Sequence, residues 1–274
     1  MSERVIAMPA MTDAQAASWH AAMDLYEAVP DGWTLVGGQM VHLWCADRRS
    51  FVARPTDDVD AVLDVRARPE ILYIVTAALR DSGFSPETST DGVQHRWVRG
   101  KAVIDVLIPR GLGERAANRR GAGGGRTIQT PGAQKVLDRS EVIRVRIDKR
   151  IGQMPRPTLL GAIVGKSSAY TVMLDQTRQR HLVDLVALAS ILQPSDVSGD
   201  HPLDRTESKT IANAVGAARA DARAWGSVPN GREALERLAG IVQRARARQQ
   251  ARGDIMRDGS PRAETTDTRL KPEQ

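Results

Sequence analysis

The sequence predicts an α+β protein, with a mixed β-sheet and flanking helices in its N-terminal part and a helical C-terminal half. Two observations lead to this prediction. Up to about residue 155, short apolar or alternating segments typical of strands are interleaved with segments of helical spacing. From Pro157 onward, every patterned segment has helical spacing. We therefore expect a core over 1–155, a helical domain over 156–250 and a disordered polar tail over 251–274.

The N-terminal part begins with a helix over 12–29, for which Thr12 is the expected N-cap. The apolar run "WTLVGG" predicts a short strand that turns, at its two glycines, into a helix around "QMVHLWCA". A polar loop, "RRSFVARPT", then leads to the segment "DVDAVLDV". Its acidic and apolar residues alternate, which predicts another strand.

The next elements are a helix over 68–84, which Gly83 would end, and two strands over 93–100 and 101–109 that form a hairpin. The stretch 110–134 is rich in Gly and Arg and predicts a mobile loop. It is followed by an alternating strand, "SEVIRVRID". In the C-terminal half, helical spacing predicts helices over the following ranges: 157–174, 177–192, 207–225 and about 232–250.

Composition restricts the partners and the compartment. The formal net charge of +6 and the pI of about 9.9 favour a polyanionic partner such as nucleic acid. Cys45 is the only cysteine, so neither an internal disulfide nor a cysteine-rich zinc site can form. The N-terminal residues do not resemble a secretory signal, and no apolar stretch approaches the ~18 residues of a membrane span. We therefore expect a cytoplasmic protein with no membrane partner.

Two carboxylates project together from the strand "DVDAVLDV". Residues two apart on a strand point to the same side, so Asp58 and Asp60 share a face while Asp57 points away. Their mutual repulsion would be relieved by a divalent cation, and Mg²⁺ prefers such oxygen ligands. The alternative is an exposed strand end without a ligand.

A third carboxylate, Asp105, stands in the apolar strand "KAVIDVLIP", between Val103 and Leu107 on its own side. An acid in this position indicates either an edge strand that faces solvent or a functional site. On a strand next to Asp58 and Asp60, it would complete a site for one or two metal ions.

Two charged residues interrupt apolar faces in the helical half. Lys166 shares its face with Leu159, Ile163, Tyr170 and Met173, and Asp184 shares its face with Leu188 and Ile191, one turn after His181. Burying either charge alone would be costly. They form either a buried salt bridge, with no further role, or part of the metal site. In the second case, Lys166 would contact the phosphates of a substrate, and Asp184 would hold Lys166 or help to activate the group with which the substrate reacts.

The ordered set Gly37-Gly38, Thr56-x-Asp58-Val59-Asp60 and Asp105 resembles the nucleotidyltransferase superfamily. The resemblance implies that 1–155 is a nucleotidyltransferase core. In it, Gly37 and Gly38 start a helix beside the triphosphate, while Asp58, Asp60 and Asp105 hold Mg²⁺. Two features depart from the pattern: Gln39 stands where many members carry Ser or Thr, and the gap from Gly38 to Asp58 is longer than usual.

Within that superfamily, "GKSSAY" and "RQRHLVDLVAL" resemble the helical half of AbiEii/MenT-type toxins, with Lys166 and Asp184 at their lysine and aspartate positions. His181 stands where a lysine or similar residue is common. The resemblance implies catalytic roles for Asp58, Asp60, Lys166 and Asp184. It also implies nucleotide transfer from a nucleoside triphosphate to RNA, the tRNA 3′ end in characterised cases, and a cognate antitoxin.

Two alternatives remain open: transfer to a small molecule such as an antibiotic, and a non-catalytic nucleotide-binding module. Arginines in the Gly-rich stretch could grip a triphosphate or RNA, or lie in solvent; they are Arg115, Arg119, Arg120 and Arg126. Arg144 and Arg146 share one strand face, more consistent with exposure than with a cleft. The run "RARARQQAR" indicates a solvated helix face, with RNA contact as the other possibility.

Overall fold

The computed structural model of the protein describes residues 4–51, 54–197 and 202–258. Its strands are β1 (Val5–Ala7), β2 (Trp33–Val36), β3 (Val59–Leu63), β4 (Ser85–Pro86), β5 (Arg96–Arg99), β6 (Ala102–Pro109), β7 (Ile128–Thr130), β8 (Ser140–Ile147) and β9 (Arg150–Pro157). The helices up to α5 are α1 (Asp13–Ala28), α2 (Gly37–Asp47), α3 (Ile71–Asp81), α4 (Glu114–Ala117) and α5 (Ala133–Leu137). The later helices are α6 (Leu159–Ala169), α7 (Gln179–Ser190), α8 (Arg205–Ala220), α9 (Ala222–Gly226) and α10 (Gly231–Asp258), with a 3₁₀ turn over Pro194–Val197.

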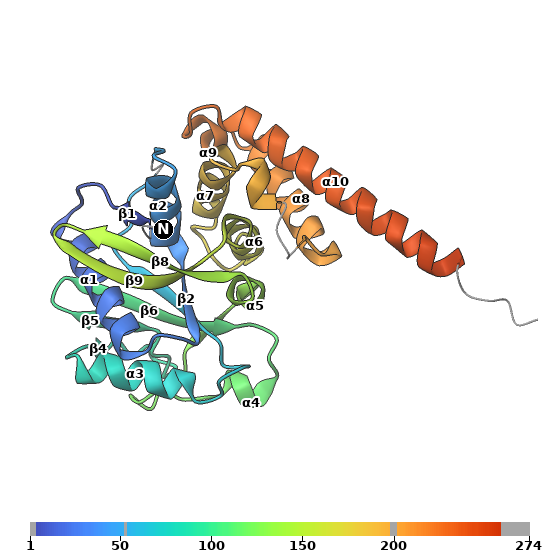
Figure 1. Cartoon of the computed structure of the whole chain (residues 1–274). Coiled ribbons are helices and arrows are strands. Elements are labelled where there is room, and N and C mark those ends of the chain that lie inside the picture. The colour runs from blue at the N-terminus through green and yellow to red at the C-terminus, as the bar shows by residue number, and fades with distance from the viewer. Residues whose placement is uncertain (1–3, 52–53, 198–201, 259–274) are drawn as a thin grey trace, which may run out of the picture.

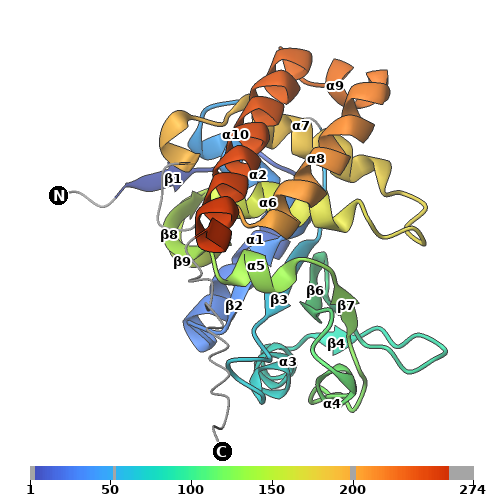
Figure 2. The ribbon, with the colours of Figure 1, turned by 90° about the vertical axis from the view of Figure 1, so that its right-hand side faces the viewer.

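The strands form two sheets in the N-terminal part (Figure 1). The larger sheet has the order β2-β3-β6-β5-β4, and β7 pairs with β6 beside it. Strand β3 runs parallel to β6, whereas β2 and β5 are antiparallel to their neighbours, so the sheet is mixed. The smaller sheet has the order β1-β8-β9. Helices α6 to α10 gather on one side of the sheets, with α10 outermost (Figures 1 and 2). The predicted α+β class is confirmed.

Local sequence signals explain most of these elements. Thr12 caps α1 with a full capping box, in which its hydroxyl accepts from the Gln15 backbone and the Gln15 side chain accepts from the Thr12 backbone. Strand β2 passes directly into α2 at Gly37, as the glycine pair predicted. Gly100 has a positive φ in the turn between β5 and β6, which form the predicted hairpin.

Three expectations are corrected by the structure. The stretch 110–134 is not simply a loop, because it contains α4, β7 and the start of α5. The helix expected over 207–225 is two helices that meet at Asp221, whose side chain accepts a hydrogen bond from the Arg223 backbone and caps the second. Helix α10 continues to Asp258, so 251–258 are helical, and the rest of the expected disordered tail lies outside the described residues.

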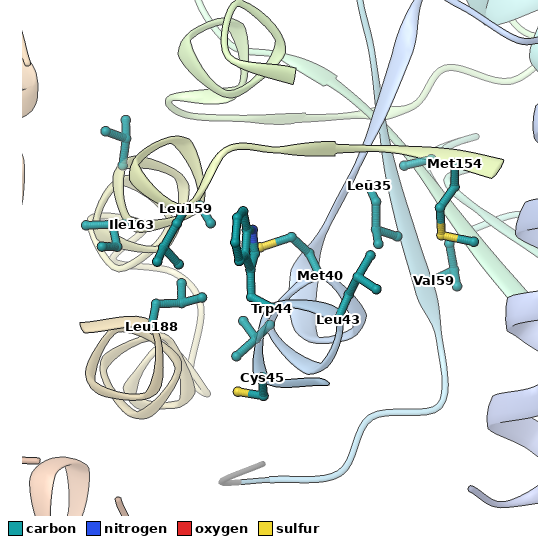
Figure 3. Close-up of a cluster of buried hydrophobic side chains, with 14 of the residues drawn as sticks. Leu35, Met40, Leu43, Trp44, Cys45, Val59, Met154, Leu159, Ile163 and Leu188 are labelled. Atoms are coloured by element: carbon teal, nitrogen blue, oxygen red, sulfur yellow. The ribbon is translucent and has the colours of Figure 1, made fainter. Parts of the chain in front are cut away.

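Helix α2 is buried between the sheet and the helical half (Figure 3). Leu35 and Val59 of the sheet lie on one side of it, and Leu159 and Leu188 lie on the other. Trp44 contacts the helical side, and its indole Nε1 donates to the Pro157 carbonyl at 3.1 Å. One apolar core therefore continues across residue 156, and α2 fixes the position of the helical half relative to the sheet. Among the described residues, no helix combines the length and apolarity needed to cross a membrane.

Candidate active site

A cleft of about 440 Å³ lies between the larger sheet and helices α5 to α7. Six of the seven site residues named from the sequence line this cleft: Gly37, Gly38, Asp58, Asp60, Asp105 and Lys166. Asp184, the seventh, is not among its lining residues. The cleft therefore brings together groups that are up to about 130 positions apart in the chain.

The glycine pair lets the start of α2 lie directly against the carboxylates. Gly37 has φ +70°, and a Cβ on it would lie 1.7 Å from Asp60 Oδ2. A Cβ on Gly38 would lie 2.5 Å from Thr56 Cγ2. Because no side chain in the described part of the chain caps this end of α2, its first N–H groups remain suited to an anionic ligand.

The three acids meet on neighbouring strands. Asp60 on β3 lies opposite Asp105 on β6 in the parallel ladder, and Asp58 precedes Asp60 by two residues. Burial, followed by repulsion from Asp58 and Asp105, raises the pKa of Asp60 to about 7. The Thr56 hydroxyl donates to Asp58 Oδ1 at 2.7 Å and orients that carboxylate. An oxygen-only cluster with an excess of negative charge suits a divalent cation.

Arg96 on β5 already engages two of these acids. Its Nε and Nη2 donate to the two oxygens of Asp105 at 2.9 and 2.7 Å, and Nη2 also lies 3.1 Å from Asp58 Oδ2. Sequence reasoning missed this residue, although the hairpin register contains the signal: pairing Arg99 with Ala102 places Arg96 opposite Asp105.

Lys166 and Asp184 form a buried ion pair with a third member. Lys166 Nζ lies 2.7 Å from Asp184 Oδ2, with only 4% and 2% of the two side chains exposed. Arg54 donates from Nε and Nη2 to both Asp184 oxygens, each at 2.8 Å. Burial opposes ionisation of Asp184, but Lys166 and Arg54 outweigh it, so its pKa lies below the ordinary value. The salt bridge is therefore real, and Lys166 also lines the cleft.

The alternative in which Asp184 activates the acceptor does not fit this geometry. Both oxygens of Asp184 are occupied by cations, and the side chain lies behind Lys166 rather than in the cleft. Asp184 instead fixes two positive groups, Lys166 and Arg54, at the cleft wall. Arg54 was not predicted, because the polar loop that carries it has no periodicity to indicate where its side chains point.

The side chains of His181, His42 and Gln39 lie in or beside the cleft. His181 lines the cleft, and burial followed by the charge of Lys166 lowers its pKa to about 4, so the ring is neutral near pH 7. Gln39, which departs from the superfamily pattern, is buried and donates to the Thr56 carbonyl at 2.8 Å. His42 Nε2 lies 2.7 Å from the Arg54 carbonyl. Together, Gln39 and His42 hold the loop that carries Arg54 and Thr56 against α2.

The arginines of the Gly-rich stretch do not line the cleft. Arg119 instead donates to the Val65 carbonyl, and Arg120 donates to the Gly124 carbonyl at 2.7 Å. Arg144 and Arg146 on β8 also lie outside the cleft lining. The positive groups that do line it are Arg54, Arg96, Lys166 and Arg180.

Among the described residues, no group of three or more His, Cys, Asp or Glu side chains is arranged as a ready metal site. The donor chemistry of Asp58 and Asp60 nevertheless fits Mg²⁺, because their oxygens face a cleft and Asp60 takes part in none of the described ion pairs. Asp105 fits only if Arg96 releases it, since Arg96 binds both of its oxygens.

No protein-family model matches the chain, and no curated protein matches it. Solved structures resemble it at low identity. An antigenic nucleotidyltransferase-like protein from Paracoccidioides brasiliensis aligns with TM-score 0.49 and 14% identity, over 82% of this chain and 94% of that one.

Two further structures are more distant. The antibiotic-resistance factor ANT(2'')-Ia aligns with TM-score 0.30 and 13% identity, over 89% of this chain and 100% of that one. A STING-associated CdnE c-di-GMP synthase from Capnocytophaga granulosa aligns with TM-score 0.27 and 10% identity, over 89% of this chain and 84% of that one. Likenesses of this size carry no argument about function, which rests on the geometry of the cleft.

Proposed function

We propose that the cleft transfers a nucleotide from a nucleoside triphosphate to an RNA acceptor, with the 3′ end of tRNA as the acceptor and Mg²⁺ as the cofactor. The observation that carries this proposal is the meeting of four kinds of group in one cleft. They are an uncapped helix start at Gly37, paired acids at Asp58 and Asp60, a third acid at Asp105 and a fixed lysine at Lys166.

Each group has a role in binding or orienting the triphosphate. The N–H groups at the start of α2 bind phosphate oxygens, which the absence of a Cβ at Gly37 and Gly38 permits. Lys166, held at 2.7 Å by Asp184, presents a fixed positive charge to the phosphates. Asp58 and Asp60 would hold Mg²⁺, which would offset the negative charge of the phosphates.

In the reaction, the 3′-hydroxyl oxygen of the acceptor attacks the α-phosphorus in line. A new P–O bond forms, the bond to the bridging oxygen of the β-phosphate breaks, and pyrophosphate leaves. The hydroxyl proton passes to one of the three carboxylates. Catalysis of this kind depends on positioning and charge stabilisation, which explains why so many contacts in the cleft fix charged groups in place.

Transfer to the tRNA 3′ end would block aminoacylation, so we propose that the protein is a growth-arresting toxin restrained by a cognate antitoxin. The basic balance of the chain, +6 at pH 7, supports an RNA acceptor through phosphate contacts. Expression of the wild-type protein alone should arrest growth, and the Asp60→Ala variant should not.

Labelling tests the proposed chemistry directly. The purified protein is incubated with total RNA, Mg²⁺ and each α-labelled nucleoside triphosphate in turn. We expect Mg²⁺-dependent label in tRNA that is lost in Asp60→Ala and retained in Asp57→Ala. Asp57 is the matched control, because it is the neighbouring acid, is exposed and does not line the cleft.

Other outcomes separate the alternatives. Label on an aminoglycoside, with none in RNA, would favour the small-molecule transferase. Tight nucleotide binding without label in RNA or in any small molecule would favour a non-catalytic binding module. Equal labelling by Asp60→Ala and the wild type would show that the reaction does not take place in this cleft.

A further inference from the structure

We propose that Arg96 is an internal cation for the acidic cluster and that a divalent metal ion must displace it from Asp58 and Asp105. This inference rests on the proposed function only in taking the acidic cluster as a metal site. It concerns a residue that the chemistry above does not use, and it predicts how tightly the metal-free protein takes up a metal.

The contacts of Arg96 place it where metal ligation would occur. Its fork binds both oxygens of Asp105, at 2.9 and 2.7 Å, so a metal ion that approaches these oxygens is repelled by the charged guanidinium. The same Nη2 lies 3.1 Å from Asp58 Oδ2. Asp58 also accepts from Thr56 through Oδ1, so each of its oxygens has a partner.

Charge explains why a cation is held there. Asp58, Asp60 and Asp105 carry up to three negative charges within one corner of the cleft, and Arg96 supplies one positive charge. The guanidinium group of Arg96 donates to both Asp105 and Asp58, and arginine keeps its charge in proteins. Arg96 is therefore a counterion that cannot be neutralised in water near pH 7.

The geometry of β5 makes displacement feasible. The Arg96 side chain is 37% exposed, so it can leave Asp105 for solvent or for a phosphate group without opening the core. A phosphate group of the triphosphate, like a carboxylate, can accept two parallel hydrogen bonds from a guanidinium group. Arriving nucleotide and metal would thus separate Arg96 from the acids together, whereas metal alone has to compete with it.

The test measures metal binding rather than transfer. Mn²⁺ is titrated into the nucleotide-free protein, and free Mn²⁺ is followed by electron paramagnetic resonance. We expect Arg96→Gln to bind Mn²⁺ at least tenfold more tightly than the wild type. Arg96→Lys, which keeps the charge without the fork, should fall between them.

Arg99→Gln is the matched control. Arg99 lies on the same strand with the same 37% side-chain exposure, but it pairs with Asp24 at 3.3 Å, away from the cleft. Its Mn²⁺ affinity should stay within about twofold of the wild type, because neither Asp58 nor Asp105 contacts it.

Thermal unfolding gives a second readout. Without metal, Arg96→Gln should melt at a lower temperature than the wild type, because the acids lose their counterion. Mg²⁺ should raise its melting temperature more than that of the wild type.

Equal or weaker Mn²⁺ affinity in Arg96→Gln would overturn the inference while leaving nucleotidyl transfer intact. Tighter Mn²⁺ binding with no labelling of any acceptor would support the inference and count against the proposed function. A failure of both Arg96→Gln and the wild type to bind Mn²⁺, with or without a nucleoside triphosphate, would overturn both.

Discussion

At Gly37, one missing methyl group decides whether the cleft can form. The residue has φ +70°, which side chains rarely adopt, and its Cβ would occupy the position of the Asp60 carboxylate. Gly37→Ala should therefore destabilise the protein by about 2–4 kcal/mol and abolish labelling. Urea unfolding and the labelling assay measure the two effects.

A second glycine provides the control for Gly37. A Cβ on Gly216 of α8 would meet nothing within 4 Å. Gly216→Ala should be neutral, or stabilise by up to about 1 kcal/mol because alanine favours the helix. If both variants unfolded like the wild type, the close approach of α2 to Asp60 would not be needed.

His181 should make stability depend on pH. In the folded protein its pKa is about 4, against about 6.5 when unfolded, because burial and then Lys166 disfavour the charged ring. Between pH 6.5 and about 4, the His181 ring binds a proton in the unfolded chain but not in the folded protein. The free energy of unfolding therefore falls as the pH falls. His181→Gln removes this loss, which amounts to up to about 3 kcal/mol by pH 4.

Urea unfolding of His181→Gln and the wild type at pH 7.5, 5.5 and 4 measures the effect. Above pH 7, the free energy of unfolding should change with pH in the same way for both proteins. Below pH 6, it should fall less for the variant than for the wild type. Parallel curves from pH 7.5 to 4 would show that the His181 ring is not desolvated in solution.

The residues of the cleft differ in how far the sequence predicted them. Asp58 and Asp60 could be identified because strand alternation fixes which acids share a side, and Gly37 because a glycine pair directly follows the apolar run "WTLV". Arg54 and Arg96 could not be identified by such means, since neither interrupts an apolar face. Arg54 lies in an aperiodic loop, and Arg96 is one of two arginines on a half-exposed strand, where a charge is ordinary. What selects them is their partner in space, Asp184 or Asp105.

At the scale of elements, α6, α7 and the loop before β3 are joined by one buried charge cluster. Asp184 of α7 binds Lys166 of α6 and Arg54 of the loop. Asp184→Asn leaves two cations with no counterion and should cost about 3–5 kcal/mol. Lys166→Met keeps the paired bonds from Arg54 to Asp184, so it should cost less, about 1–2 kcal/mol.

Urea unfolding measures this asymmetry, and an exposed pair gives the control. Arg219 of α8 pairs with Glu236 of α10 at the surface, and Glu236→Gln should cost less than about 1 kcal/mol. If Lys166→Met lowers the free energy of unfolding as much as Asp184→Asn does, Arg54 alone does not stabilise the buried carboxylate of Asp184.

Strand β9 shows why some elements escaped prediction. Its sequence, "RIGQMPRP", contains a glycine and two prolines, residues that normally argue against a strand. Pairing with β8 along its whole length, from Arg150 to Pro157, overrides this composition. Strand β7 escaped for a related reason, since only its pairing with β6 distinguishes it from the Gly-rich stretch around it. Tertiary pairing, rather than local preference, makes both strands.

For the molecule as a whole, the cleft depends on the contact between the two halves. The acids come from the sheet and Lys166 comes from α6, while α2 packs against both (Figure 3). The expected order of a mixed sheet followed by helices is correct, but the shared core was not foreseen, because apolar spacing does not say which faces meet. Neither half alone contains both the acids and the lysine.

At the scale of the whole molecule, contacts connect the cleft to the outermost helix of the helical half. Ala133 and Val136 of α5 line the cleft, and Lys135 of the same helix pairs with Asp204 at the start of α8. Gln249 of α10 donates to the Leu203 carbonyl beside that start. The cleft is thus connected through α5 and α8 to the outer helix.

Helix α10 carries three exposed arginines close to this junction, Arg244, Arg246 and Arg248, and it extends beyond the helices it packs on (Figure 1). Reversing all three to Glu should weaken RNA labelling strongly at low salt and leave nucleotide binding unchanged, because none of them lines the cleft. If each arginine contacts one phosphate, the slope of log affinity for RNA against log salt concentration should fall by about 2–3. Filter binding of tRNA from 50 to 200 mM salt measures this slope.

The control is the double variant Arg110→Glu with Arg115→Glu, on the exposed Gly-rich stretch. It should change neither the salt slope nor the labelling beyond the general effect of net charge. An equal loss in both variants would mean that RNA responds to the total charge of the protein and that α10 is simply a solvated helix.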